Sequence, residues 1–149
     1  MKVSKVKRSS YEAALHLLKY RGQSETELRL KLKMRGYEAG DIEETIGRLK
    51  EYQYVDDESL AEDLFDSLRA RHCYGDSYIH QKMKYRGLQT DRHLSSEEEF
   101  QDALHLVREK SRIFPHFLDH YRKAASFLLR RGYSASVIRA VLSEFTFND

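Results

Sequence analysis

The chain is poor in residues that cross-link loops or interrupt helices. Its 149 residues include one cysteine (Cys73), one proline and seven glycines. A single cysteine excludes an internal disulfide and indicates a reducing compartment. No apolar run approaches the roughly 20 residues that a membrane-spanning helix requires, and residues 1–5 lack the apolar core of a signal peptide. The sequence therefore predicts a cytoplasmic protein with no membrane partner.

Motifs for catalysis or cofactor binding are also missing. No glycine-rich phosphate loop precedes a helix, and His72 and Cys73 have neither a CxxC partner nor an HExxH helix around them. The seven histidines are scattered along the chain. Asp56 and Asp57 suit a helix cap better than a catalytic pair, because adjacent residues point to different sides of a helix. We predict no catalytic residue, no cofactor, no metal site and no enzymatic activity.

What the chain does have is one short pattern that occurs three times, at residues 32–37, 83–88 and 128–133. In each copy an apolar residue lies four positions before a glycine, an arginine directly precedes the glycine, and a bulky apolar residue follows it. This pattern is typical of a helix C-terminus: the glycine takes the left-handed conformation, the arginine lies near the negative end of the helix dipole, and the hydrophobe folds back onto the last turn.

The spacing of these glycines, about 50 residues, suits a repeat of three short helices. Residues 103–108 nearly copy residues 14–19, which supports an internal repeat. The predicted fold class is all-α, with three tandem three-helix repeats in an elongated, curved array. The predicted boundaries are a basic N-terminal tail at 1–8, repeat 1 at 9–55, repeat 2 at 56–94 with a short third helix at 90–94, and repeat 3 at 95–149.

Capping residues predict where the helices begin. Ser9 with Glu12, Ser24 with Glu27, and Ser95 with Glu98 form capping-box patterns. Further caps are expected at Asp41, at the Asp56–Asp57 pair, at Ser77 and at Ser134. The first helix is expected to end at Gly22. The ten tyrosines are mostly expected to be half-buried at the junctions between repeats.

Charge is segregated although the formal net charge is only +2. Lysine and arginine gather on the second helix of each repeat, and an acidic block lies between the first two of these helices. If the repeats stack in register, the basic helices share one face, which would fit a polyanionic or acidic partner. A solvated surface whose cations complement helix C-termini is an equally consistent interpretation.

Several landmarks in a fixed order resemble the RecX family of recombination regulators. They are residues 24–29, Leu32, Gly36, Tyr37, residues 54–57, Leu60, Ala61, Gly75, Ile79, Gly87, Leu88, residues 127–133 and Ile138. The resemblance extends from about residue 11 to residue 145. The sequence departs from the family at Tyr78, where an arginine is expected, and at His72 and Cys73, where a basic residue and a glycine are expected. These departures concern a contact from the middle repeat.

The resemblance implies a non-enzymatic modulator of the RecA recombinase, acting in recombination, DNA repair and the SOS response. Members of the family bind in the helical groove of the RecA–DNA filament and limit its growth, its ATPase activity and strand exchange. We expect a monomer whose filament-binding face includes Arg29, Lys33, Lys82, Arg86, Arg130 and Arg131. Two alternatives stay open: a direct nucleic-acid-binding three-helix module, making at least weak DNA contact, and a helical scaffold for another protein.

Overall fold

The computed structural model describes residues 7–148, and the regular structure in that range is entirely helical. This confirms the predicted all-α class. The helices are α1 (Ser10–Leu18), α2 (Glu25–Met34), α3 (Ala39–Glu51), α4 (Asp57–Arg69), α5 (Asp76–Tyr85), α6 (Ser96–Ile113), the 3-10 helix η1 (Pro115–Asp119), α7 (Tyr121–Arg130) and α8 (Ala135–Leu142). Lys2 and Lys5 of the predicted basic tail lie outside the described residues.

The chain divides into two compact units. The N-terminal unit comprises Met1–Glu62 and Tyr85–Leu88, and the C-terminal unit comprises Asp63–Lys84 and Gln89–Asp149. The division falls within α4, and the last residue of α5, Tyr85, belongs to the N-terminal unit together with the three residues that follow it. The boundaries of the three repeats stay a prediction.

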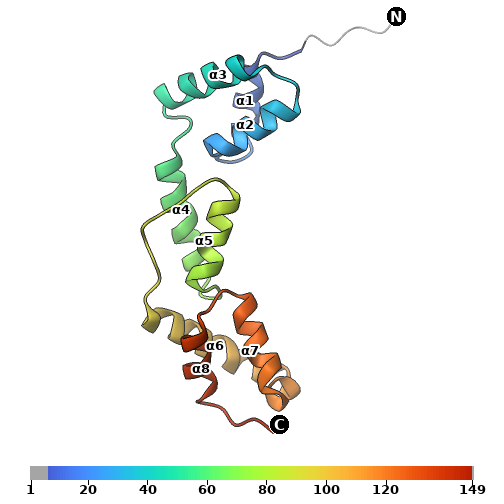
Figure 1. The fold of residues 1–149 in the computed structure, drawn as a ribbon, viewed down its shortest axis with the longest axis vertical. Helices are drawn as coiled ribbons and strands as arrows, with labels where there is room; N and C mark the ends of the chain where they lie inside the picture. Colours follow the sequence, from blue (N-terminus) through green and yellow to red (C-terminus); the bar gives the residue numbers. More distant parts are fainter. Residues whose placement is uncertain (1–6, 149) are drawn as a thin grey trace, which may run out of the picture. The chain divides into compact units, whose positions relative to one another are not determined.

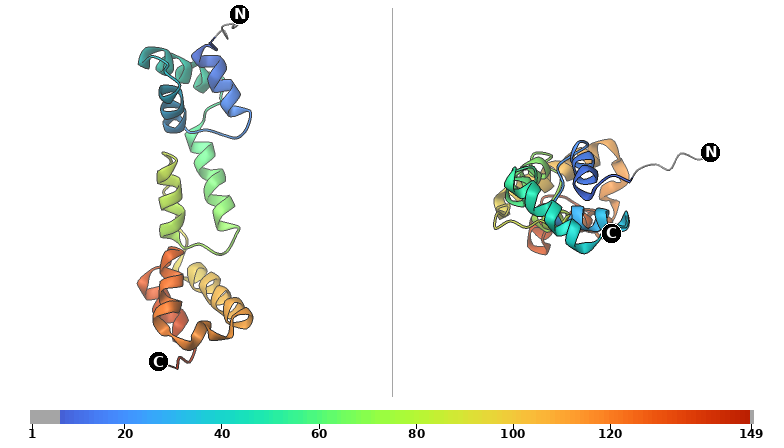
Figure 2. Two further views of the ribbon diagram at one scale, coloured as in Figure 1. Left: turned by 90° about the vertical axis from the view of Figure 1, so that its right-hand side faces the viewer. Right: turned by 90° about the horizontal axis from the view of Figure 1, so that it is seen from above.

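The core of the N-terminal unit lies between α1, α2 and α3, which pack against one another (Figures 1 and 2). Leu28 and Leu32 of α2 are one turn apart and fully buried, and they meet Ile46 and Leu49 of α3. Residues three or four apart lie on one face of a helix, so each of these helices has an apolar stripe. None of these helices buries its stripe alone, so the three form one cooperative element.

The core of the C-terminal unit lies between α6, α7 and α8, with η1 closing one side (Figure 1). Val107, Leu128 and Val141 contribute fully buried side chains from these three helices. Pro115 begins η1, and helix α6 ends just before it because proline cannot continue a helix from its interior. Phe65 of α4 is also buried and packs edge-on against the ring of His80 on α5.

All three glycine-terminated helices end as predicted. Gly36, Gly87 and Gly132 have φ angles of 89°, 74° and 90°. In the first and third, the backbone N–H of the following tyrosine bonds the carbonyl of the residue five positions earlier: Tyr37 to Leu32 and Tyr133 to Leu128. These are Schellman closures, which return the hydrophobe to the core.

The short third helix predicted at residues 90–94 is not formed, and the chain from Gly87 to Ser95 is irregular. This prediction was wrong because polar groups fix the segment in another conformation. The backbone N–H of Arg92 bonds the Thr90 hydroxyl, and the N–H of Leu94 bonds Asp76 Oδ1 at 2.8 Å. Leu94 is the one large apolar residue among residues 90–94, so this stretch has no apolar stripe for a helix to pack.

Most predicted helix starts are confirmed. The hydroxyls of Ser9, Ser24, Ser95 and Ser134 accept the expected backbone N–H bonds, and Asp56 accepts that of Ser59. Three expectations were wrong. Helix α1 ends at Leu18, before Gly22; α3 begins at Ala39, which places Asp41 inside its first turn; and α5 begins at Asp76, so Ser77 is not its cap.

Candidate partner-binding surface

The second helices of the three predicted repeats are α2, α5 and α7, and each exposes the same two positions. These positions lie three and two residues before the terminal glycine. We call them the outer pairs: Lys33 and Met34, Lys84 and Tyr85, and Leu129 and Arg130. The buried positions of these helices lie four and eight residues before the glycine, which turns the outer pair toward solvent.

Each outer pair joins one cation to one large apolar side chain. Met34 is 78% exposed, Tyr85 87% and Leu129 63%. Methionine, tyrosine and arginine are enriched at protein interfaces, where an apolar contact is surrounded by charge. The expectation that most of the ten tyrosines are half-buried was wrong, because five of them are exposed: Tyr20, Tyr52, Tyr54, Tyr85 and Tyr121. The recurrence of a cation beside an exposed apolar group on all three helices makes the outer pairs our candidate partner-binding surface.

Two of the predicted surface residues, Lys33 and Arg130, lie in outer pairs. Lys33 also borders a hollow of about 280 Å³ in the N-terminal unit, whose floor includes Ala39 and Ile42. Arg130 borders a hollow of about 410 Å³ in the C-terminal unit, whose walls are basic and aromatic. The lining of that hollow is Lys110, Phe117, Arg122, Lys123, Ser126, Phe127 and Arg130.

Arg29, by contrast, is engaged within its own unit. Its Nε lies 2.7 Å from Glu43 Oε1, and a terminal nitrogen lies 3.4 Å from Glu25 Oε1. The hydrogen bond from Arg29 lowers the pKa of the Glu43 carboxyl below its usual value. The charge of Arg29 is therefore largely balanced by its acidic neighbours.

Lys82 and Arg131 lie over aromatic rings. The ammonium of Lys82 is 5.5 Å from the ring centre of Tyr78, and the guanidinium carbon of Arg131 is 4.9 Å from that of Phe127. Such contacts cover the stem of the side chain while the charge stays near solvent. Neither residue belongs to an outer pair.

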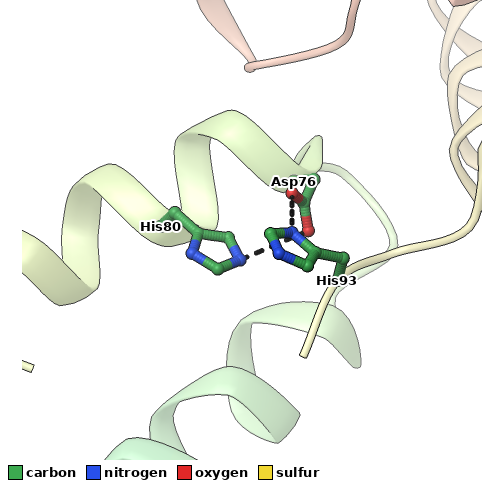
Figure 3. Close-up of side chains that lie close together, drawn as sticks. All are labelled: Asp76, His80 and His93. Carbon is green, nitrogen blue, oxygen red and sulfur yellow. Dashed lines mark hydrogen bonds and ion pairs between the residues drawn. The ribbon is translucent and has the colours of Figure 1, made fainter. Parts of the chain in front are cut away.

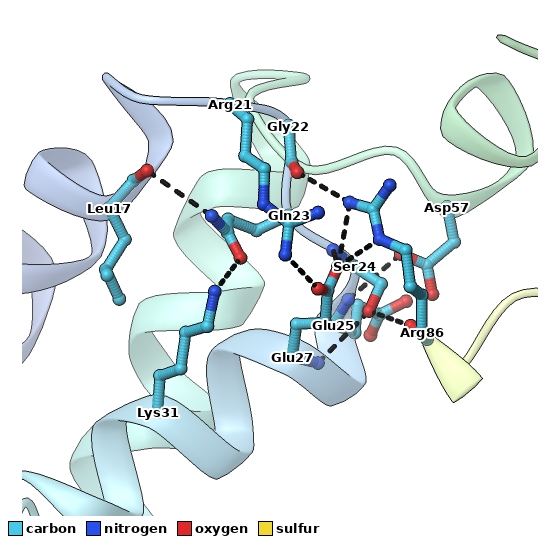
Figure 4. A network of polar contacts seen from close by, with 10 residues as sticks. All are labelled: Leu17, Arg21, Gly22, Gln23, Ser24, Glu25, Glu27, Lys31, Asp57 and Arg86. Carbon is cyan, nitrogen blue, oxygen red and sulfur yellow. Dashed lines mark hydrogen bonds and ion pairs between the residues drawn. The ribbon is translucent and has the colours of Figure 1, made fainter. Parts of the chain in front are cut away.

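Arg86 is the centre of a polar network in the N-terminal unit (Figure 4). Its Nε and a terminal nitrogen bond Glu27 Oε1 at 3.1 and 3.0 Å, and the terminal nitrogen also bonds the Gly22 carbonyl at 2.9 Å. Only 19% of the Arg86 side chain and 12% of the Glu27 side chain are exposed. Arg86 therefore stabilises the contact between the end of α5 and the start of α2, and its side chain is mostly buried.

Glu27 receives donors from three directions in the same network. Burial raises the pKa of its carboxyl, but hydrogen bonds from Arg86 and from the Ser24 backbone N–H, with the positive charges of Arg86 and Arg21, lower the pKa overall. A carboxyl with a lowered folded pKa stabilises the fold above its unfolded pKa, and this contribution disappears as the pH falls through the folded pKa.

We therefore expect the stability of the N-terminal unit to depend on pH through Glu27. The variant E27Q should lower the free energy of unfolding by about 1–3 kcal/mol at pH 7, because a half-buried ion pair is lost. The difference from the parent should shrink as the pH falls below about 4.5, the ordinary pKa of the group. Urea unfolding of the parent and of E27Q at a series of pH values measures this difference in the free energy of unfolding. The exposed Glu44, changed to Gln, serves as the control; an equal effect there would contradict the assignment.

The chain makes two equivalent junctions at the terminal glycines. In the N-terminal unit the Ser24 hydroxyl donates to the carbonyl of Arg86, the residue before Gly87. In the C-terminal unit the Gly75 N–H donates at 2.7 Å to the carbonyl of Arg131, the residue before Gly132. Ser24 and Gly75 directly precede α2 and α5. A helix C-terminus thus meets a helix N-terminus in both places, which pairs opposite ends of two dipoles.

Close approach makes glycine necessary at both junctions. A Cβ atom on Gly87 would collide with the side chain of Thr26, and one on Gly132 would collide with the backbone and Cβ of Tyr78. At Gly36 the nearest atom to such a Cβ would be Lys7 Nζ, 3.6 Å away, which is ordinary contact. Gly36 therefore ends a helix, whereas Gly87 and Gly132 also form junctions.

A buried carboxylate supports the junction of the C-terminal unit. Glu99 of α6 is nearly inaccessible and accepts backbone hydrogen bonds from Asp76 and Ser134, at the starts of α5 and α8. Burial raises the pKa of Glu99, and the negative charge of Asp76 raises it further. Its Oε2 atom has no hydrogen-bond partner.

The structure brings two of the scattered histidines, His80 and His93, next to one aspartate. Asp76, His80 and His93 place potential metal-ligand atoms within 4.8 Å of one another (Figure 3). Asp76 and His80 are four residues apart, a spacing visible in the sequence. His93 comes from the segment predicted to be a helix, so its approach to the other two was not predictable from spacing.

The described residues form an all-helical protein in which an exposed cation–apolar pair recurs near the ends of α2, α5 and α7. No helix in residues 7–148 is long and apolar enough to cross a membrane. The sequence matches the family model for the first three-helix domain of RecX at residues 11–49 and that for the third at residues 97–142. The chain belongs to the RecX family.

Individual relatives agree with this assignment. The chain is 33% identical to regulatory protein RecX of Vibrio campbellii, over 91% of this chain and 90% of that protein. It is 31% identical to regulatory protein RecX of Clostridium botulinum (strain Eklund 17B / Type B), over 89% of this chain and 66% of that protein. The family name supports a regulatory role.

Solved structures of the family support the fold. The crystal structure of RecX from Lactobacillus salivarius superposes with a TM-score of 0.74 at 22% identity, over 91% of this chain and 93% of that one. A second crystal structure of a regulatory protein RecX gives a TM-score of 0.75 at 19% identity, over 96% of this chain and 82% of that one. These matches fit a helical array of three-helix domains.

Proposed function

We propose that this protein binds the RecA filament on DNA, in its helical groove, and limits filament growth, ATPase activity and strand exchange. Its place of action is the cytoplasm, and it acts as a monomer. The observation that carries the proposal is the outer pair, which recurs on α2, α5 and α7. A filament repeats the same surface along its length, and a chain of repeated contacts suits such a partner.

The proposed contact depends on linkage between weak sites. One exposed cation contributes little to binding in water, and one exposed apolar side chain adds a small buried area. When three such contacts are joined in one chain, the second and third become intramolecular and their combined affinity rises steeply. The outer pairs replace Arg29, Lys82, Arg86 and Arg131 as the residues that we assign to the filament face.

A second candidate function is direct binding of nucleic acid, favoured by the basic hollow of the C-terminal unit. Its four cations are Lys110, Arg122, Lys123 and Arg130, and Phe117 and Phe127 lie among them. Cations suit phosphates, and aromatic rings suit bases. The formal net charge of only +2 opposes this function, because the acidic residues of the chain repel a long polyanion.

Co-sedimentation separates the two functions. The protein is mixed with RecA filaments on single-stranded DNA, with bare single-stranded DNA, and with RecA alone, at about physiological ionic strength, where weak exposed charge contacts are screened. We expect binding to the filament and little to bare DNA. Equal binding to filament and bare DNA, falling steeply with added salt, would overturn the proposal in favour of the nucleic-acid module. Binding to neither would overturn both.

A further inference from the structure

Asp76, His80 and His93 converge at one point of the C-terminal unit (Figure 3). Asp76 is the first residue of α5 and His80 lies one turn later, so both side chains project from the same face of the helix. His93 reaches them from the irregular segment that follows Gly87. Three potential ligands thus come from two separate pieces of backbone.

The distances suit a small metal ion. His93 Nδ1 lies 2.7 Å from Asp76 Oδ2, and His80 Nε2 lies 3.5 Å from Asp76 Oδ1. Tetrahedral ligands about 2.0–2.2 Å from a zinc ion lie roughly 3.3–3.6 Å from one another. The distances between the potential ligand atoms of Asp76, His80 and His93 are at most 4.8 Å, and they lie both below and above that range. Small side-chain rotations, which move each ligand atom by a fraction of an ångström, would bring all three ligand atoms into coordination.

Without a metal, hydrogen bonds hold the same groups. His93 Nδ1 bonds Asp76, and His80 Nε2 bonds the carbonyl of Arg92 at 2.9 Å. The two imidazole rings stack with their centres 4.5 Å apart. A metal ion replaces the protons on these two nitrogens and keeps the arrangement of the side chains, so the site is already organised for a cation.

The charges around the cluster also favour a cation. The cluster contains the carboxyl of Asp76, and the buried carboxyl of Glu99 is close enough to interact with it electrostatically. Glu99 Oε2 has no hydrogen-bond partner of its own. The nearest cation of the segment is Arg92, whose terminal nitrogen lies 2.8 Å from Asp66 Oδ1 and whose guanidinium carbon lies 4.4 Å from the ring centre of Phe65. Its charge is therefore engaged by Asp66 and Phe65.

We propose that Asp76, His80 and His93 form a binding site for one Zn²⁺ ion, with solvent completing the coordination. Two imidazole nitrogens and one carboxylate oxygen suit Zn²⁺, Co²⁺ or Ni²⁺, whereas Mg²⁺ and Ca²⁺ require mainly oxygen ligands. The ion links the segment after Gly87 to the first turn of α5. It fixes the conformation of the stretch in which the repeat pattern predicts a helix.

The test is titration of the full-length protein with Zn²⁺ by calorimetry, and with Co²⁺ by visible absorption, which reports coordination directly. We expect one Zn²⁺ per chain with a Kd of about 10 μM or below, and at least tenfold weaker binding by H80A and by H93A. No saturable binding by the parent protein, or equal binding by parent and variants, would overturn the proposal.

The chain offers a matched control. His116 Nδ1 lies 2.9 Å from Asp119 Oδ2 in a similar histidine–aspartate pair, beside which residues 7–148 place no third ligand. H116A should therefore bind Zn²⁺ as the parent does. Since His93 lies outside the helices, H93A should keep the helical circular dichroism of the parent. A loss of binding in H116A equal to that in H93A would assign the ion elsewhere and overturn the proposal.

Discussion

Replacing Gly132 by alanine is expected to lower the free energy of unfolding of the C-terminal unit by about 3 kcal/mol or more. One part of this loss is the left-handed backbone conformation at φ 90°, which costs an alanine about 1 kcal/mol. The larger part is the collision of the new Cβ with the backbone N and Cα of Tyr78, atoms that cannot rotate away. Urea unfolding measures the total, and hydrogen exchange at the Gly75 amide measures opening of the junction.

Gly36 and Gly87 supply graded controls. G36A carries the same backbone strain without a collision, so its loss should be about 1 kcal/mol. G87A meets the Thr26 side chain, which has some freedom to move, and should fall between the two. Equal losses at all three positions would contradict the distinction between a glycine that only ends a helix and one that also forms a junction.

Reversing one cation in each outer pair, in the triple variant K33E/K84E/R130E, is expected to weaken binding to the RecA filament by at least about 100-fold. The estimate rests on the proposed function and on a loss of about 1–2 kcal/mol for each reversed contact, added over three separate sites. The three residues are exposed, so the fold should be unaffected. Fluorescence anisotropy of the labelled protein with filaments on single-stranded DNA provides the Kd.

The control variant K19E/R108E/R139E makes the same change in net charge at exposed cations outside the second helices. It should bind the filament within about threefold of the parent, because distant exposed charges are screened at physiological salt. If both triple variants lose affinity equally, the contact depends on overall charge and the assignment to the outer pairs is wrong.

The sequence predicted most of the fold because the decisive signals are local. A glycine after an apolar residue and an arginine predicted the closures at Gly36 and Gly132, and serine hydroxyls predicted the starts of α2 and α8. The segment at residues 90–94 was predicted wrongly because its conformation depends on a distant carboxylate. Asp76 accepts a hydrogen bond from the Leu94 backbone N–H and bonds the His93 ring. No local sequence pattern predicts these two contacts.

The surface was predicted only in part, because a sequence shows charges without their partners. The sequence indicates that Arg29 and Arg86 are basic but does not show their ion-pair partners. In the structure Arg29 pairs with Glu43, and Arg86 pairs with Glu27. The predicted surface did not include Met34 and Tyr85, because methionine and tyrosine are also common in protein cores. Both residues lie two positions before a helix-ending glycine, and this spacing can be read from the sequence.

The two junctions impose an order of events during synthesis of the chain. The hydroxyl of Ser24 donates its hydrogen bond to the carbonyl of Arg86, 62 residues further along the chain. The amide of Gly75 donates to the carbonyl of Arg131, which also comes later in the chain. While α2 leaves the ribosome, the residue that accepts the hydrogen bond of the Ser24 hydroxyl has not yet been translated. Each junction can therefore form only after a later segment of the chain has been synthesised. Folding of the nascent protein proceeds from its N-terminus, and each junction forms about one repeat behind synthesis.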